Sequence, residues 1–400
     1  MLDRQSQATF MERIDGVDAL RGFALMGLFL VHASEYFELY WLDPPKHNLV
    51  HDIVFGLFAG KSFAMFAMMF GFSFFIIMDR SSRRGVDFSV RFFWRLTLLF
   101  VFGFFDALVY AGEVLQVLAL CGLVLVPVNR LSWRWLLPLA GFCLLGPQLI
   151  WIYWRANTDL AFNVAPLHWK YPALEVFAHG DVMQLLATNL WQGPLTKWQF
   201  YWETGRIFEI LGLFLCGLML GRIGFFQEPE RFARPRRLAF AIALGVLLGL
   251  QALTPWIETA FPADKPHFLA GWARDTLVHD VWQPLAGMTL WVTGFVELYQ
   301  WAKPRAVLRL LAPAGRMTLT LYVSQGVIGI PLFYGCGLGL YATIGQPRAL
   351  LLGAAVFAAQ VVWAHWWFKR FLYGPLEWLW RAGTFGSLAV PFRRVGLDKT

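Results

Sequence analysis

The sequence predicts an all-α polytopic membrane protein, and three observations support this prediction. Of the 400 residues, 58% are hydrophobic and only 15% are charged, whereas roughly a quarter are charged in a soluble protein. Trp and Phe are abundant, with 20 and 38 copies, as expected for aromatic side chains that lie among lipid headgroups. Several apolar runs also reach the ~20 residues that a helix needs to cross a bilayer.

About ten apolar runs are predicted to span the membrane. The second run contains Lys61, so its first third is predicted to lie along the interface. A tight hairpin is predicted at Ala111–Glu113, where glycine and a charge interrupt the apolar pattern. The predicted spans are 17–39, 53–78, 92–111, 113–129, 135–154, 204–224, 238–257, 281–301, 311–333 and 349–368.

The distribution of basic residues predicts the orientation of these spans. One side of the membrane receives 23 of the 34 Lys and Arg residues, the other side receives 7, and the rest fall inside spans. The positive-inside rule therefore places both termini in the cytosol. Residues 155–203 and 258–280 become long outer loops, which are uncommon unless they cover a site. The tail 369–400 contains RFLYGPLEWLWR, predicted as an amphipathic helix on the membrane surface.

Other features of the sequence argue against several classes of protein and several kinds of site. The net charge of +8 is explained by cytosolic loops, so nucleic-acid binding is not predicted. The four cysteines lie in apolar runs without metal or disulfide spacing. Motifs of nucleotide-driven pumps, serine hydrolases and zinc proteases are absent from the sequence. With no internal repeat, residues 1–400 are expected to form one domain, multi-pass in a bacterial inner membrane.

Ionisable side chains within spans are costly and mark candidate sites, and the first span holds the densest set. Arg21 and His32 are eleven residues apart, which is three helical turns within about 20° and ~16 Å along the axis. Glu35 follows His32 on the same stripe, and Asp18 precedes Arg21. An imidazole takes protons near neutral pH, so His32 is a candidate base with Glu35 as its orienter. The alternatives are an N-capping role for Asp18, snorkelling for Arg21 and a structural hydrogen bond for His32.

Two further segments carry candidate residues. KHNLVHD offers His47, His51 and Asp52, either as an acid–base cluster on the outer surface or as ordinary loop polarity; no metal site is predicted, because further ligands do not follow. PAGRMTLTLYVSQ places Arg316 on a polar helix that is expected to line a cavity. Its candidate binding residues are Arg316, Tyr322, Ser324 and Gln325.

Charged residues elsewhere are expected to be structural. Glu203, Arg206 and Glu209 are spaced by three and are expected to form a stack of ion pairs in the sixth span. Asp106 and Glu113 flank the predicted hairpin near the outer face.

Five segments resemble the YeiB family of bacterial membrane proteins. RIDGVDALRGFALMGLFLVH, GKSFAMFAMMFGFSF, GEVLQVLALCGLVL, PAGRMTLTLYVSQ and FLYGPLEWLWR follow in the family's order and cover nearly the whole chain. That family resembles the transmembrane acyltransferase superfamily, which includes OafA-like O-acetyltransferases and heparan-α-glucosaminide N-acetyltransferase. The chain departs from its relatives at His32, where YeiB-type proteins more often have Asn, and at Asp106, where many have His.

The resemblance implies a membrane acyltransferase that takes an acyl group, expected to be acetyl, from cytosolic acyl-CoA. Arg21 and His32 match the Arg, ten residues, His pattern of OafA-like enzymes. Arg21 is then expected to attract the phosphates of acyl-CoA, which serves as the donor substrate. His32 is expected to act as the base or to carry the acyl group. A saccharide or lipid headgroup is the expected acceptor, below the Trp-rich outer loops. The alternatives are a small-metabolite transporter, or a structural or sensory membrane protein.

Overall fold

The computed structural model describes residues 14–35, 37–42, 49–169, 173–261 and 265–394, and helices dominate this part of the chain. The long helices are α2 (Asp15–Ser34), α4 (Lys61–Arg83), α5 (Ser89–Val109), α11 (Val182–Glu203), α12 (Arg206–Ile223), α13 (Ala233–Ala260), α15 (Gln283–Tyr299), α18 (Thr318–Phe333) and α19 (Gln346–Trp367). Shorter helices connect them: α3 (Leu49–Leu57), α6 (Leu115–Gly122), α7 (Leu125–Val128), α8 (Trp133–Leu144), α9 (Pro147–Thr158), α10 (Ala173–His179), α14 (Phe268–Asp275), α16 (Ala302–Leu308), α17 (Ala312–Arg316) and α20 (Pro375–Phe385). The all-helical prediction is confirmed for the described residues.

Five helices in the described part are long and apolar enough to cross a bilayer, which indicates a membrane protein. They comprise α2, the α3–α4 segment, α5, α13 and α19; counting the bent pair α8–α9 as one span makes six. The remaining predicted spans are shorter or more charged helices. The ten-span count is therefore not reached by length and composition alone.

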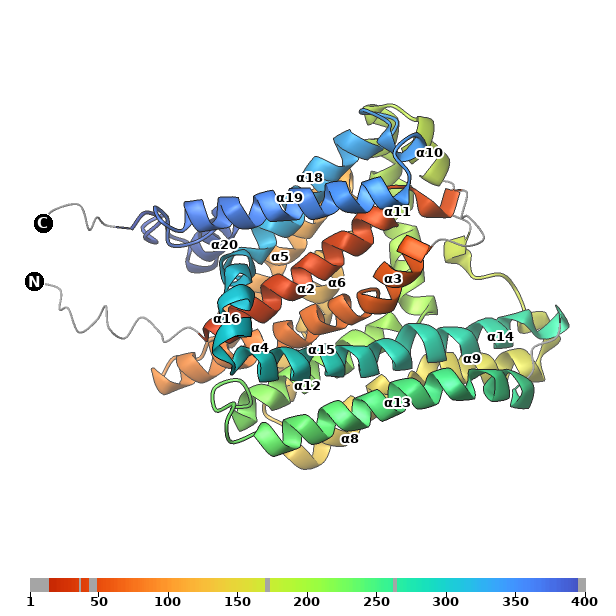
Figure 1. The fold of residues 1–400 in the computed structure, drawn as a ribbon, viewed down its shortest axis with the longest axis horizontal. Helices are drawn as coiled ribbons and strands as arrows, with labels where there is room; N and C mark the ends of the chain where they lie inside the picture. The colour runs from red at the N-terminus through yellow and green to blue at the C-terminus, as the bar shows by residue number, and fades with distance from the viewer. Residues whose placement is uncertain (1–13, 36, 43–48, 170–172, 262–264, 395–400) are drawn as a thin grey trace, which may run out of the picture.

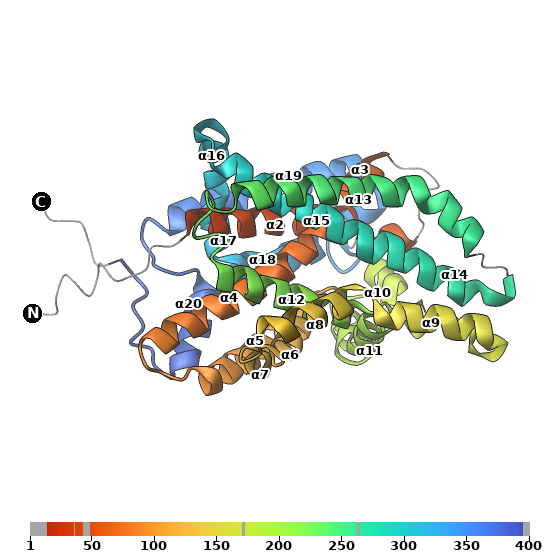
Figure 2. The same ribbon diagram turned by 90° about the horizontal axis from the view of Figure 1, so that it is seen from below.

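Helix α2 runs through the middle of the bundle (Figures 1 and 2). It packs against α17, α18 and α19 on one side and against α4 and α15 on the other. This position explains its burial, because most of its residues from Val17 to Ser34 lie in the core. The central position places the candidate residues of α2 inside the protein rather than in lipid.

Glycines allow the central helices to approach closely. A Cβ atom on Gly217 of α12 would lie 1.9 Å from the carbonyl oxygen of Met68 on α4, and one on Gly71 would lie 2.1 Å from that of Phe214. Where α17 crosses α2, a Cβ on Gly315 would lie 1.7 Å from the carbonyl oxygen of Asp18. Small residues at such crossings are typical of membrane helices, which associate through close backbone packing.

The Gly217→Ala variant is expected to be less stable by about 1–3 kcal/mol, because the new methyl group overlaps the backbone of α4. The matched control is Gly249→Ala on α13, whose Cβ would meet nothing within 4 Å. In detergent, thermal unfolding of the purified variants measures the difference. Equal unfolding temperatures for Gly217→Ala and the wild type would contradict the close α4–α12 crossing.

The structure confirms the predicted break at 111–113, shows a second break at Gly60, and corrects two segments. The chain turns at Ala111–Glu113, and the long second run breaks at Gly60, whose φ is 70°, so that α3 and α4 are separate helices. The run 113–129 forms the short helices α6 and α7 rather than one long helix. Residues 155–203 do not form an irregular loop, because they contain the 22-residue helix α11, packed against α5.

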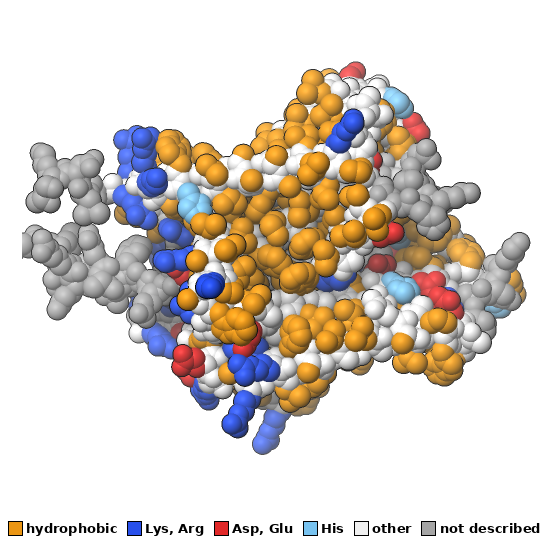
Figure 3. Space-filling model, in the orientation of Figure 1, with side chains coloured by type: hydrophobic (Ala, Val, Ile, Leu, Met, Phe, Trp, Pro, Cys, Tyr) orange, Lys and Arg blue, Asp and Glu red, His pale blue; other side chains and the backbone are white. Residues whose placement is uncertain are grey.

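Charged side chains are concentrated at the ends of the molecule. Lys and Arg gather at the end where both chain termini leave the bundle, and a broad apolar band covers the middle of the same face (Figure 3). Exposed Leu, Val, Phe and Trp side chains lie on α5, α8, α13 and α19. Such a band suits contact with lipid tails.

Candidate functional site

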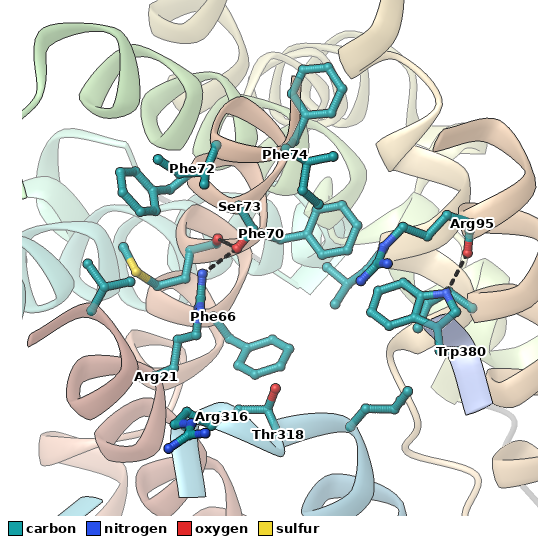
Figure 4. A pocket seen from close by; sticks show the side chains of 18 of the residues that line it. Arg21, Phe66, Phe70, Phe72, Ser73, Phe74, Arg95, Arg316, Thr318 and Trp380 are labelled. Atoms are coloured by element: carbon teal, nitrogen blue, oxygen red, sulfur yellow. Dashed lines mark hydrogen bonds between the residues drawn. The ribbon is translucent and has the colours of Figure 1, made fainter. Parts of the chain in front are cut away.

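A cavity of about 320 Å³ opens among α2, α4, α5, α18 and α20, near the start of α2. This volume lies in the range of small-molecule sites. Much of its lining is apolar, chiefly Phe, Leu and Met side chains of α4 and α5 (Figure 4). Its polar lining is dominated by four arginines: Arg21, Arg80, Arg95 and Arg316.

Arg21 is held in place by two neighbours. Its guanidinium donates to Asp18 Oδ1 at 3.0 Å and to Ser73 Oγ at 2.6 Å, and the Ser73 hydroxyl donates to the carbonyl oxygen of Met69 (Figure 4). These contacts fix the Arg21 side chain between α2 and α4 at the cavity wall. Arg21 and Asp18 therefore both line the cavity.

Two other arginines are stacked on aromatic rings. The Arg95 guanidinium lies 3.6 Å from the ring centroid of Trp380, and the guanidinium of Arg316 lies 4.0 Å from that of Phe368. Stacking on a ring face fixes the plane of a guanidinium while its N–H groups point outward along the edge. Both side chains are thus preorganised to receive an anionic group in the cavity.

Hydrogen bonds from the N-terminal turn of α18 hold α20 against this cavity. The Glu377 carboxylate accepts hydrogen bonds from the backbone N–H of Thr320 at 3.0 Å and from its hydroxyl at 2.6 Å. Burial raises the pKa of Glu377 above its usual value, and the hydrogen bonds from Thr320 act in the opposite direction. Two indole N–H groups also donate hydrogen bonds between α5 and α20. Trp380 donates to the carbonyl oxygen of Arg95, and Trp94 donates to that of Gly383. Helix α20 therefore packs on α5 and α18, where sequence analysis had placed it on the membrane surface.

Among the cavity-lining residues of α18, Tyr322 lies furthest along the helix and therefore marks the inner end of the cavity. The ring of Tyr322 also lies beside His32. The Tyr322 hydroxyl accepts a hydrogen bond from the Val114 N–H at 3.1 Å. The imidazole of His32, only 8% exposed, lies 6.2 Å from the Tyr322 ring and 5.3 Å from that of Tyr110 between ring centroids. His32 thus lies in the core of the bundle, one aromatic ring beyond the arginine-lined cavity.

Glu35 contacts a different set of groups. Its carboxylate accepts a hydrogen bond from the indole of Trp41 at 2.7 Å, and the charges of Arg206 and Asp280 act on it. The predicted role of Glu35 as the orienter of His32 therefore lacks the expected contact. The nearby ion-pair stack is confirmed only in part: Arg206 pairs with Glu209 at 3.5 Å.

Glu203 belongs to a separate contact. It binds the imidazole of His168 and accepts from the backbone N–H groups of Leu167 and His168. The helix break at Gly205, with φ of 70°, turns Glu203 away from the following helix. The predicted stack of ion pairs required one continuous helix across 203–209, which the structure does not have.

The KHNLVHD segment is only partly described, and His47 lies outside the described residues. The His51 ring lies between the rings of Tyr40, at 4.2 Å, and Phe55, at 3.8 Å. Asp52 is exposed, 3.5 Å from His51. These contacts show His51 in a packing position. Among the described residues, no group of three or more His, Cys, Asp or Glu side chains is arranged to hold a metal ion.

The polar residues predicted on and just before α18 do not all line the cavity. Ser324 donates to the Leu321 carbonyl and accepts from Gln360, so it links α18 to α19 rather than lining the cavity. Gln325 is buried on the side of α18 that carries Tyr322, and it does not line the cavity. Of the four residues predicted on this helix segment, Arg316 and Tyr322 line the cavity.

Sequence analysis missed several of the buried polar residues. Lys197 of α11 donates to Glu113 and, at 2.8 Å, to Gln116, and all three side chains are buried. Lys197 lies within 155–203, which was predicted as an outer loop because its Trp-rich sequence does not resemble a membrane helix. Arg95 and Ser73 were missed for another reason: an arginine near a span end is usually a topology signal, and serine in an apolar run carries little signal.

The fold and the cavity together define a helical membrane protein with an arginine-lined internal pocket. Comparisons with known proteins show similarity to bacterial proteins over nearly the whole chain. It is 27% identical to "Uncharacterized protein YxaH" of Bacillus subtilis (strain 168), covering 94% of this chain and 95% of the relative. It is 26% identical to "Uncharacterized protein YeiB" of Escherichia coli (strain K12), covering 93% and 96%. Residues 220–387 match the family described as "Protein of unknown function (DUF418)". The chain is similar to YeiB over most of its length, and the resemblance to the YeiB family stated from its motifs is confirmed.

Proposed function

We propose that this protein is a membrane-embedded acyltransferase that uses acyl-CoA, with acetyl-CoA as the expected donor. The observation that supports this proposal most is the cavity itself. Four arginines lie in an otherwise apolar pocket, whose inner end, Tyr322, contacts the imidazole of His32. A donor with several phosphates at one end and a thioester at the other matches this polarity.

The arginines would bind the phosphates of the donor. Arginine recognises phosphate through charge-assisted, frequently bidentate hydrogen bonds. Arg21 and His32 are ~16 Å apart along α2. The apolar lining from Phe66 to Leu118 would then hold the extended arm that carries the thioester towards the centre of the bundle.

His32 would act as the general base of the transfer. It takes the proton from a hydroxyl or amine of the acceptor, whose oxygen or nitrogen forms a bond to the acyl carbon. The bond between that carbon and sulfur breaks, and the thiolate leaves and takes up a proton to become the free thiol of CoA. Positioned acid–base groups of this kind typically contribute about 10²–10⁴-fold to rate.

The proposal includes a topology. Ten spans would place both termini in the cytosol of a bacterium, with the protein in the inner membrane and 155–203 on the outer side. The basic end of the molecule, where the termini lie, supports this orientation. The arginine cavity would then face the compartment that contains acyl-CoA. A saccharide or lipid-headgroup acceptor would enter from the opposite side.

A transporter for a small metabolite is the second candidate function. The buried Lys197–Glu113–Gln116 network favours it, because ionisable groups inside a helical bundle also line translocation paths. A transporter would move its substrate unchanged. Chemical conversion of the donor therefore separates the two candidates.

Acetyl-CoA is expected to bind the purified protein, and Arg21→Ala or Arg95→Ala is expected to weaken binding by about 10-fold or more. Each variant removes a hydrogen bond to a charged group, worth about 1.5–3 kcal/mol. Isothermal titration calorimetry in lipid nanodiscs measures the affinities. Arg134→Ala is the matched control, since Arg134 is exposed on α8 and outside the cavity lining. Wild-type protein without affinity for acetyl-CoA, or equal losses in all three variants, would refute the donor site.

A further inference from the structure

Two buried polar side chains near His32 have hydrogen-bonding groups that the described residues do not satisfy. Both carboxylate oxygens of Asp106 on α5 are buried without a hydrogen-bond partner in that part of the chain. The same holds for the amide oxygen and the amide nitrogen of Gln325 on α18. The two residues are 4% and 1% exposed. A buried polar group without a protein partner is costly, so it calls for a partner such as a bound ligand, an ion or water.

Asp106 and Gln325 face the same part of the bundle. A Cβ atom on Gly326, the residue after Gln325, would lie 3.5 Å from Asp106 Oδ1 and 2.9 Å from the Cβ atom of Tyr110. Tyr322, Gln325 and Gly326 lie within about 100° of one another around α18, because a helix turns about 100° per residue. This face of α18 is therefore directed towards Asp106 and the ring of Tyr110.

Aromatic rings surround this position. The His32 ring lies 5.3 Å from Tyr110, 6.2 Å from Tyr322 and 6.3 Å from Phe37, and Phe37 lies 5.5 Å from Tyr110. Tyr322 also forms the inner end of the arginine cavity. Asp106 and Gln325 are therefore connected to the candidate base through the rings of Tyr110 and Tyr322, and Tyr322 also lines the candidate donor cavity.

The nearby network of Lys197, Glu113 and Gln116 is equally buried, yet its polar groups have hydrogen-bond partners. Lys197 donates to both Glu113 and Gln116, and Glu113 also accepts the backbone N–H of Gln116 at 3.2 Å. The charges of Glu113 and Lys197 act on Asp106, so the two sets are adjacent. The side chains of this network hydrogen-bond to one another, whereas the carboxylate of Asp106 and the amide of Gln325 have no such partner among the described residues.

We propose that Asp106 and Gln325 bind the acceptor, and that the acceptor presents neighbouring hydroxyl groups, as a carbohydrate does. The two oxygens of a carboxylate accept from two donors side by side, which matches adjacent hydroxyls. The amide of Gln325 needs a partner that both donates and accepts, which hydroxyls do and an ammonium group does not. The rings of Tyr110, Tyr322 and Phe37 provide apolar faces against which a sugar ring packs.

This inference rests on the proposed acyltransferase function for its place in a reaction, and its test does not measure acyl transfer. The probe is octyl β-D-glucoside, below its micellar concentration, titrated calorimetrically into wild-type protein in nanodiscs without acyl-CoA. Octanol is the control for the binding of the alkyl chain. The glucoside is expected to bind, and Asp106→Asn and Gln325→Met are each expected to weaken its binding by about 10-fold or more.

A second measurement separates a binding role from a structural one. Gln325→Met removes a buried amide without partners, and Asp106→Asn removes a buried negative charge, so each variant relieves a burial cost and is expected to raise the apparent unfolding temperature by about 2 °C. Glu113→Gln is the matched control, because the same carboxyl-to-amide change in the satisfied network is expected to lower that temperature and to leave glucoside binding in place.

Three outcomes would overturn the assignment: wild-type protein that does not distinguish the glucoside from octanol, variants that bind the glucoside normally, or variants that unfold at lower temperature. Acetyl-CoA binding is measured on the same samples. If the glucoside binds at Asp106 while acetyl-CoA does not bind, the proposed acyltransfer fails and the carbohydrate site remains.

Discussion

Replacing His32 by alanine is expected to lower the rate of acyl transfer by about 10²–10⁴-fold, because the variant loses the group that accepts the acceptor's proton. Affinity for acetyl-CoA is expected to persist, since Arg21, one of the arginines proposed to bind its phosphates, lies ~16 Å away along α2. Transfer of a radiolabelled acetyl group and calorimetric affinity for acetyl-CoA, measured on the same preparation, test both parts.

A loss of activity through misfolding must be separated from a loss of the base. His32 is buried against Tyr110 and Tyr322, so the alanine variant leaves a small void. His32→Gln fills the same space without a basic nitrogen and is expected to be as inactive as His32→Ala at near-normal unfolding temperature. Full activity in either variant would show that His32 is not the base. If acetyl-CoA binding and transfer were also unchanged in Arg21→Ala, the transporter candidate would be favoured.

The Lys197→Met variant is expected to lose about 3–5 kcal/mol of stability, which is the largest effect expected on the fold. Lys197 and Glu113 are 8% and 0% exposed, and removing the cation leaves a carboxylate buried beside Gln116 without its counter-charge. Chemical unfolding in detergent micelles, followed by tryptophan fluorescence, measures the loss.

The double variant Lys197→Met with Glu113→Gln provides the control. It removes both charges, so much of the lost stability is expected to return, as it does when buried ion pairs are replaced as a unit. Wild-type stability in Lys197→Met alone would mean that water reaches this pair and that α11 does not depend on it for packing against α5.

The spacing of charges along one helix was the most informative part of the sequence. Arg21 and His32 were predicted to share a face of the first span, and the structure places Arg21 at the cavity wall and His32 in ring contact with the residue at the cavity's inner end. A single helix has a fixed periodicity, so positions on it follow from residue numbers alone.

Contacts between distant segments were not predictable in this way. Arg95 and Trp380 are 285 residues apart, and nothing in either local sequence indicates that their side chains stack. Trp and polar residues in 182–203 resembled a surface loop, although this segment forms a helix whose lysine reaches Glu113. The pairing of Glu35 with Trp41 depends on how the chain turns after α2, which periodicity does not determine.

The attachment of α20 to α18 and α5 has a consequence for the synthesis of the protein. The cavity wall is built from α2, near the start of the chain, and from Trp380, near its end, and Trp94 bonds to Gly383 across 289 residues. Synthesis must therefore pass Trp380 before the pocket has all its walls. Premature termination before Pro375 removes the Glu377 anchor and Trp380 together, so a truncated chain would insert its membrane helices and still lack a complete pocket.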